Sequence, residues 1–266
     1  MYNLWVPSRS PILVIVLFSL LFLAGCTTTY SSNRGVSLPS KKRMTKAVWD
    51  AARSPEVWLP AAGAAVLQID HADESVSDWA REEHILFGSE QRAQSWSDAG
   101  IDIGKAANFI ARGISTAERP AEWHQEAFEF GVDVLATEAT RRSTDFLKDT
   151  AKRKRPNGAN RLSFPSGHTS KATAHSRVAA LTLSHTLWLG EGAPVWHGLA
   201  TANSLMTGWA RVEAGWHYPS DSLAGMALGN FLARSVRNSF VELPADEGPI
   251  VGLTPGGAWV GWGTRF

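Results

Sequence analysis

Residues 165–169 read Pro-Ser-Gly-His-Thr and are the most informative stretch of this 266-residue chain. Pro, Ser and Gly favour a turn, and the sequence from Thr169 onward favours a helix. The free backbone N–H groups at such a helix start attract an anion, and Gly167 lets the anion approach the backbone closely. Ser166 adds a hydroxyl donor, and His168 can exchange a proton near neutral pH. A turn with a capping serine and a surface histidine would show the same local sequence.

A pair of cations precedes this stretch. Lys148 and Arg155 are seven residues apart, so in a continuous helix both side chains would project from one face. Pro156 favours an extended conformation for Arg155 and predicts that the helix ends there. The pair overlaps a basic run at residues 152–155, so a solvated charged face is the alternative interpretation.

A third polar cluster follows the stretch and contains Arg211, His217 and Asp221. Pro219 predicts a helix start, because proline is tolerated in the first turn of a helix. His217 would then stand at the helix entrance, with Asp221 one turn inside. A carboxylate within reach of an imidazole fixes its tautomer, orients the ring and stabilises the imidazolium ion. A His–Asp pair that only caps the helix is the alternative.

The three clusters together supply the groups that phosphoryl transfer needs. That reaction requires positive charge at the equatorial oxygens, an in-line nucleophile and an acid for the leaving oxygen. Three cations, a turn rich in N–H groups and two histidines meet these needs without a metal ion. His168 and His175 could share a helix face, but no third residue has the spacing of a metal ligand. We therefore expect neither a metal site nor a cofactor.

These residues resemble the three-part signature of the type 2 phosphatidic acid phosphatase and vanadium haloperoxidase superfamily. The order and the gaps agree in Lys148-x6-Arg155-Pro156, Pro165-Ser166-Gly167-His168 and Arg211-x5-His217-x3-Asp221. The resemblance implies an all-α helical bundle with a phosphate pocket at one end. It implies that His217 attacks phosphorus, that Asp221 orients His217, and that His168 protonates the leaving alcohol. Water would then hydrolyse the phosphohistidine, and the phosphate oxygens would be held by Lys148, Arg155, Ser166, the N–H of Gly167, and Arg211.

One position departs from the family, because Ala210 stands where a serine usually precedes the arginine of the third motif. We expect this change to tune the affinity for phosphate and not to abolish function. The resemblance thus favours a metal-independent phosphatase acting on phosphate monoesters, lipid phosphates or lipid diphosphates. Two alternatives stay open. One is a vanadate-dependent haloperoxidase that holds vanadate with the same cations and His217. The other is a catalytically silent phosphate-binding lipoprotein of the envelope.

The N-terminus predicts export and a lipid anchor. Residues 1–25 combine a positive charge at Arg9, an apolar stretch and small residues before Cys26, as in a secretory signal peptide. Leu23-Ala24-Gly25-Cys26 also resembles the bacterial lipobox, which implies that the thiol of Cys26 is acylated, for example with palmitate. A plain signal peptide or an uncleaved anchor is the alternative. Thr27 after the cysteine implies the outer membrane, with the enzyme facing the periplasm.

The rest of the chain predicts a tether, a helical domain and a β-like tail. Residues 26–43 are rich in Ser and Thr and favour a flexible tether. Residues 44–245 form the predicted helical phosphatase domain, and the glycine-punctuated residues 246–266 predict a hairpin or an extended tail. We expect helices over 44–53, 58–69, 75–86, 98–114, 120–154 (one or two), 169–189, 194–214 and 220–240. Ser97 and Asp98 resemble an N-terminal cap and predict the start of the helix over 98–114.

Charge and hydropathy limit the partners of the chain. Removal of residues 1–25 takes away one positive charge, Arg9, and changes the net charge from +1 to 0. No global charge therefore favours nucleic acid. The mature sequence has no apolar run of 18 residues, so we expect a domain attached to the membrane by its lipid anchor and not one that spans it. The expected partners are this membrane and a phosphorylated small molecule or lipid.

Overall fold

The computed structural model describes residues 39–118, 123–186, 189–241, 246–254 and 257–265. The predictions for the signal peptide, Cys26 and nearly all of the tether lie outside these residues. The described helices are α2 (Lys41–Arg53), α3 (Pro55–Val66), α4 (Ala72–Glu83), α5 (Glu90–Glu118), α6 (Trp123–Ala151), α7 (Gly167–Leu183), α8 (Ala193–Glu213) and α9 (Pro219–Phe240), with a short 3-10 helix at Gly190–Gly192.

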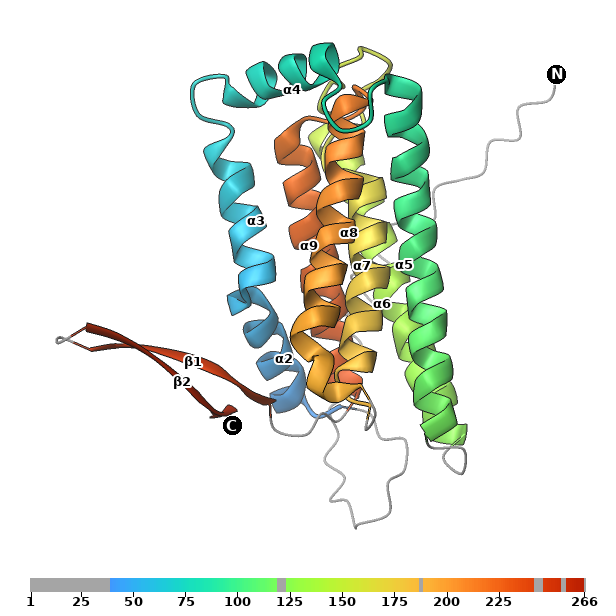
Figure 1. Cartoon of the computed structure of the whole chain (residues 1–266), viewed down its shortest axis with the longest axis vertical. Helices are drawn as coiled ribbons and strands as arrows, with labels where there is room; N and C mark the ends of the chain where they lie inside the picture. The colour runs from blue at the N-terminus through green and yellow to red at the C-terminus, as the bar shows by residue number, and fades with distance from the viewer. Residues whose placement is uncertain (1–38, 119–122, 187–188, 242–245, 255–256, 266) are drawn as a thin grey trace.

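Helices α5 to α9 run side by side, and α4 lies across one end of the bundle (Figure 1). The C-terminal residues form strands β1 (Asp246–Thr254) and β2 (Gly257–Arg265), which pair antiparallel, as the glycine-punctuated tail predicts. Among the described residues the first helix begins at Lys41, inside the predicted tether, where the Ser40 hydroxyl accepts the N–H of Arg43 at 3.2 Å and caps it. None of the described helices combines the length and the apolar character needed to cross a membrane.

Helix α7 is the central element of the bundle. It packs against α5, α6, α8 and α9, so its sequence of small residues and threonines carries no polar face. Its buried side chains come from all sides of the helix and include Ala172, Thr173, Ala174, Val178 and Leu181. A helix that is enclosed in this way gives the residues at its N-terminus a rigid base.

Two glycines let α9 approach α7 closely. A Cβ atom at Gly225 would lie 2.5 Å from the carbonyl oxygen of Ser166, and one at Gly229 would lie 2.6 Å from that of Ser170. Any larger residue would therefore push the two backbones apart. The approach brings the start of α9, which follows His217 directly, against the turn that starts α7.

The predicted start of α5 at Ser97 and Asp98 is wrong. The helix begins two turns earlier, where the hydroxyl of Ser89 accepts the N–H of Arg92 at 3.3 Å. Ser97 is buried inside the helix and donates its hydroxyl to the carbonyl of Gln94 at 2.8 Å. Small polar residues in mid-helix resemble a cap in sequence, but here Ser97 faces the interior of the bundle and Asp98 is exposed.

Helix α6 is one helix and ends before the residue that the sequence predicts. It stops at Ala151, and Lys152 takes a left-handed conformation with φ 46°. Arg155 therefore lies in the loop that follows, and it does not share a helix face with Lys148. The predicted termination at Pro156 is displaced by one turn of helix.

Candidate active site

His217 lies in the short loop between α8 and α9, where the residue is only 1% exposed. Its Nδ1 lies 2.6 Å from the carbonyl oxygen of Ser163. A carbonyl can only accept, so Nδ1 carries the hydrogen and Nε2 keeps its lone pair. Burial lowers the pKa of His217 to about 3, and the charge of Lys148 acts in the same direction. The imidazole is therefore neutral over the physiological range.

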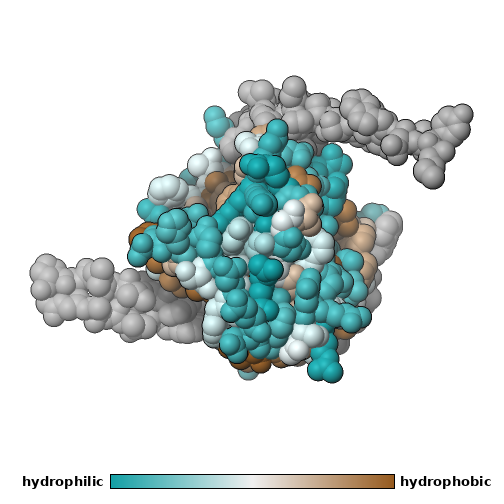
Figure 2. Space-filling view, turned by 90° about the horizontal axis from the view of Figure 1, so that it is seen from above, coloured by the Kyte–Doolittle hydropathy of each residue, from teal (hydrophilic) through white to brown (hydrophobic). Residues whose placement is uncertain are grey.

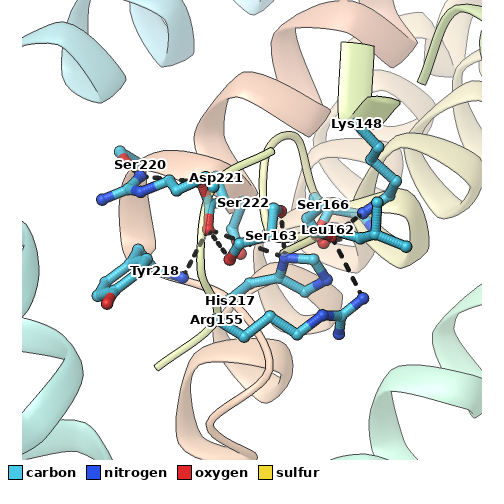
Figure 3. Close-up of polar contacts among 12 residues, drawn as sticks. Lys148, Arg155, Leu162, Ser163, Ser166, His217, Tyr218, Ser220, Asp221 and Ser222 are labelled. Carbon is cyan, nitrogen blue, oxygen red and sulfur yellow. Dashed lines mark hydrogen bonds and ion pairs between the residues drawn. The ribbon is translucent and has the colours of Figure 1, made fainter. Parts of the chain in front are cut away.

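Asp221 supports His217 mainly through Ser163. Its Oδ2 accepts the hydroxyl of Ser163 at 2.5 Å and the N–H of Tyr218 at 2.9 Å, but lies 3.9 Å from Nδ1 of His217. Asp221 thus lies close to the neutral imidazole, while the hydrogen bond of the ring goes to the backbone of Ser163 (Figure 3). Burial alone would raise the pKa of Asp221, but His217, Arg153 and Ser163 outweigh burial and hold that pKa below its usual value.

Arg153 joins this group, although its sequence context indicated only a solvated basic run. Its Nη1 donates to Oδ1 of Asp221 at 2.9 Å, and its Nη2 donates to Oδ2 of Asp73 at 2.7 Å. Both carboxylates are buried, at 0% and 1% exposure. Asp73 also accepts the N–H of Ser220 at 2.8 Å, which ties α4 to the first turn of α9. Arg153 is therefore the centre of a buried network behind His217.

Lys148 and Arg155 converge on one point of the backbone. The Nζ of Lys148 and the Nη2 of Arg155 both donate to the carbonyl of Leu162, at 2.6 and 3.3 Å. Their charged ends lie beside the ring of His217 (Figure 3). Burial, followed by the charge of Arg155, lowers the pKa of Lys148 to about 8. The charged groups of Lys148 and Arg155 therefore lie close together, as predicted. The predicted reason was wrong, because Arg155 lies in a loop and the two residues do not share a helix face.

Arg211 is the most deeply buried of the predicted cations, at 3% exposure. Its Nη1 donates to Gln94 at 2.5 Å and lies 3.3 Å from the hydroxyl of Ser97, while its Nε has no hydrogen-bond partner among the described residues. Burial, with the charge of Arg155, lowers the pKa of Arg211 to about 10. A buried guanidinium with a spare donor and no carboxylate bound to it is well suited to an anion.

The ring of Trp216 contacts the guanidinium groups of two of these arginines. The guanidinium carbons of Arg155 and Arg211 lie 4.8 and 5.1 Å from the centre of its ring. These distances are within the range of cation–π attraction. Nothing in the motif spacing pointed to this tryptophan, and an aromatic residue next to His217 was the one available signal.

The turn before α7 has the predicted form. Ser166 is the N-cap, where its buried Oγ accepts the hydroxyl of Thr169 at 2.9 Å, and Gly167 is the first helical residue. A Cβ atom at Gly167 would lie 3.5 Å from Cε of Lys148, so the helix start faces that lysine. The backbone N–H groups of the turn therefore lie beside a cation, as anion binding requires.

His168 contacts a carboxylate that the sequence had suggested only as part of a helix cap. Its Nε2 lies 2.8 Å from Oδ1 of Asp98 on α5, and its side chain is 30% exposed. Burial and the charge of Arg211 lower the pKa of His168 to about 4, and Asp98 opposes this shift. The described residues contain no group of three or more side chains able to hold a metal ion.

Ala210, the departure from the family signature, is fully buried in an apolar cluster. It packs with Phe87, Ala93 and Ala214, and Trp216 covers the cluster. The methyl group at this position therefore contributes to the contact between α5 and α8.

All predicted site residues that the structure describes lie at one end of the bundle, the end crossed by α4. Seen from above, this end presents a mostly hydrophilic surface, and apolar side chains lie toward the flanks (Figure 2). Two histidines, three cations and a helix N-terminus at one end can bind a phosphate group and exchange protons with it. The one predicted site residue outside this region is Cys26, which lies outside the described residues.

Comparison with known proteins agrees with this architecture. Residues 126–243 match the sequence model of the PAP2 superfamily, a range that includes all three polar clusters. The fold resembles the solved structure of a transmembrane PAP2-type phosphatidylglycerolphosphate phosphatase from Bacillus subtilis. The TM-score is 0.53 and the identity 21%, over 73% of this chain and 94% of that chain. At this identity the likeness concerns the fold alone, and the predicted all-α bundle is confirmed. No curated protein sequence matches the chain.

Proposed function

Because the chain belongs to the PAP2 superfamily through residues 126–243, we propose that it is a phosphatase whose nucleophile is His217. The observation that carries the proposal is the tautomer of this buried ring. Its Nδ1 donates to the carbonyl of Ser163, so the lone pair of Nε2 is free to attack phosphorus. The low pKa of His217 keeps that lone pair unprotonated.

The reaction proceeds in two steps. First, Nε2 of His217 attacks phosphorus, the bond to the ester oxygen breaks, and protonated His168 gives its proton to the departing alcohol. Second, neutral His168 takes a proton from water, the water oxygen attacks phosphorus, and the bond to Nε2 breaks. Inorganic phosphate leaves and His217 is restored. Asp98 stabilises the protonated form of His168, since it raises the pKa of that ring relative to burial alone.

Positive charge on the equatorial oxygens comes from the protein itself in this proposal. Lys148, Arg155 and Arg211 would surround the phosphate, and the hydroxyl of Ser166 and the N–H of Gly167 would complete the cradle. Burial lowers the pKa values of Lys148 and Arg211, and the neighbouring charge of Arg155 adds repulsion in the same direction. A bound phosphate would relieve this repulsion, and a metal ion is not required.

The substrates that we propose are phosphate monoesters, lipid phosphates or lipid diphosphates. The relative from Bacillus subtilis is described as a phosphatidylglycerolphosphate phosphatase, which supports a lipid substrate by analogy of fold. The lipobox-like residues before Cys26 support an envelope lipoprotein anchored in the outer membrane, and this anchor would hold the domain at a lipid surface. Incorporation of labelled palmitate that persists in a Cys26→Ala variant would refute the anchor.

The decisive experiment measures phosphate release by the purified protein in excess chelator. His217→Ala should lose activity by several orders of magnitude, because no other residue replaces the nucleophile. The matched control is His71→Ala, which removes an exposed histidine at the start of α4. A labelled phosphoryl group should be trapped on the wild type and be absent from His217→Ala. Equal turnover in the two proteins would exclude His217 from the mechanism, and tight phosphate binding without any turnover would identify a silent binding protein.

A further inference from the structure

An apolar groove lies behind the candidate active site. It has a volume of about 960 Å³ and runs between α3, the end of α6 and α9. Small aliphatic side chains and aromatic rings form its walls. They include Ala61, Ala65, Leu147, Phe164, Leu228 and Phe231. This volume lies in the range of ligand sites that enclose a drug-sized molecule. Neither histidine of the candidate active site lines it.

One end of the groove is basic. Lys152, Lys154 and Arg161 line it there, from the loop between α6 and α7. Arg161 donates its Nε to the carbonyl of Lys152 at 3.1 Å, which holds the two residues together. No carboxylate lines the groove in the described part of the chain, and none of these three cations forms an ion pair there. Arg153 lines the same end, but Asp73 and Asp221 neutralise it.

We propose that this groove binds a long-chain alkyl phosphate, with the alkyl chain between α3 and α9 and the phosphate on Lys152, Lys154 and Arg161. An apolar trough that ends in unpaired cations matches a ligand with an apolar chain and an anionic head. Arg153, Phe164 and Ser220 separate the groove from Asp221, so this is a second site beside the candidate active site. The inference concerns binding and does not depend on catalysis at His217.

Charge complementarity distinguishes this ligand from an apolar segment of the chain itself. The apolar residues 11–23 are long enough to fill a groove, but the chain contains no acidic residue before Asp50. A segment without carboxylates leaves the three cations unpaired, whereas an alkyl phosphate pairs with them. The structure therefore favours the amphiphile over the N-terminal segment.

The test measures binding of alkylphosphonates, which cannot be hydrolysed, to the full chain by calorimetry. The titration is done without inorganic phosphate, which would compete for Lys152, Lys154 and Arg161, and the groove variants below show which site binds the ligand. We expect affinity to rise roughly three- to fourfold for each methylene that enters the groove, since each contributes a constant increment of apolar burial. Ala61→Trp and Ala65→Trp should weaken dodecylphosphonate at least tenfold, because each places an indole in the groove. The matched control, Ala62→Trp on the same helix, lies outside the groove and should bind as the wild type does.

Head-group selectivity is tested with Lys154→Glu. This variant should weaken dodecylphosphonate at least tenfold and strengthen dodecyltrimethylammonium. Thermal unfolding midpoints within a few degrees of wild type establish that each variant is folded. Affinity that does not depend on chain length, or equal losses in Ala62→Trp, would overturn the proposal. It would also be overturned if the ligand bound only after residues 1–25 had been removed, or if Ala65→Trp dissolved a dimer, because another occupant would then fill the groove.

Discussion

Replacing Arg153 by alanine tests the buried network behind His217. The substitution leaves Asp73 and Asp221 without the cation that lies 2.7 and 2.9 Å from them, and both carboxylates are almost fully buried. Removing one partner of a buried ion pair costs about 3–5 kcal/mol, because a buried charge is left uncompensated. Each carboxylate keeps other donors, such as the N–H of Ser220 and of Tyr218, and the Arg153 side chain is 22% exposed. We therefore expect a loss at the low end, about 3 kcal/mol in the free energy of unfolding.

Urea denaturation measures this loss, with Arg142→Ala as the matched control. Arg142 pairs with Glu138 on the surface of α6, where the side chains are 39% and 38% exposed, so its replacement should cost about 0–1 kcal/mol. Arg153→Ala with Asp73→Asn should recover part of the stability, because one of the two stranded charges is gone. If Arg153→Ala were no more destabilising than Arg142→Ala, the network would not hold the start of α9, and the reasoning would be refuted.

Three further predictions concern the histidines and the tryptophan of the structure. Asp98→Asn should lower the pKa of His168 further and move the alkaline limb of the kcat/KM profile to lower pH. Each unit by which the pKa falls lowers the protonated fraction of His168 tenfold at pH values above the pKa. An alkaline limb at the wild-type pH would contradict this prediction. The pKa of His197 is lowered to about 4 by burial and Arg177, so the unfolded chain binds more protons between about pH 4 and 6.5. Stability should therefore fall as the pH drops below about 6.5, and His197→Gln should flatten the slope by up to about 1.4 kcal/mol per pH unit, measured by urea titration. Trp216→Leu removes two cation–π contacts of about 0.5–1 kcal/mol each and should raise the KM for a phosphate ester about five- to thirtyfold, whereas an unchanged KM would exclude this role.

The sequence predicts those parts of the fold that depend on interactions between residues close together in the chain. The sequence predicted the approximate ranges of the helices, and a proline-serine-glycine turn indicated the N-cap of α7 at Ser166. The spacing of Arg211, His217 and Asp221 predicted their cluster, because Arg211 lies in the last turn of α8, His217 in the short loop that follows, and Asp221 in the first turn of α9. The glycine-punctuated C-terminal residues predicted a hairpin or an extended tail, and the structure has the hairpin.

The parts that the sequence did not predict depend on contacts between distant segments. Arg153 meets Asp73 from 80 positions away, and His168 meets Asp98 from 70. No local pattern distinguishes Arg153 from its neighbours in the basic run. Arg153 differs from them only because α4 packs against the start of α9 and places Asp73 and Asp221 within its reach. Asp98 was misread as a helix cap for the same reason: a polar side chain in mid-helix is explained only by the helix that it faces.

The two histidines of the candidate active site differ in what their rings contact, and this difference supports the roles that we propose for them. His217 is sealed from solvent and donates Nδ1 to a backbone carbonyl, which stabilises the neutral form with a free lone pair on Nε2. His168 is partly exposed and contacts the carboxylate of Asp98, which stabilises the protonated form. A bound phosphate would add negative charge beside both rings, but only His168 combines access to solvent protons with a carboxylate partner. These environments support the proposed roles of His217 as nucleophile and His168 as acid, although both residues are imidazoles and the pKa of each is lowered by burial.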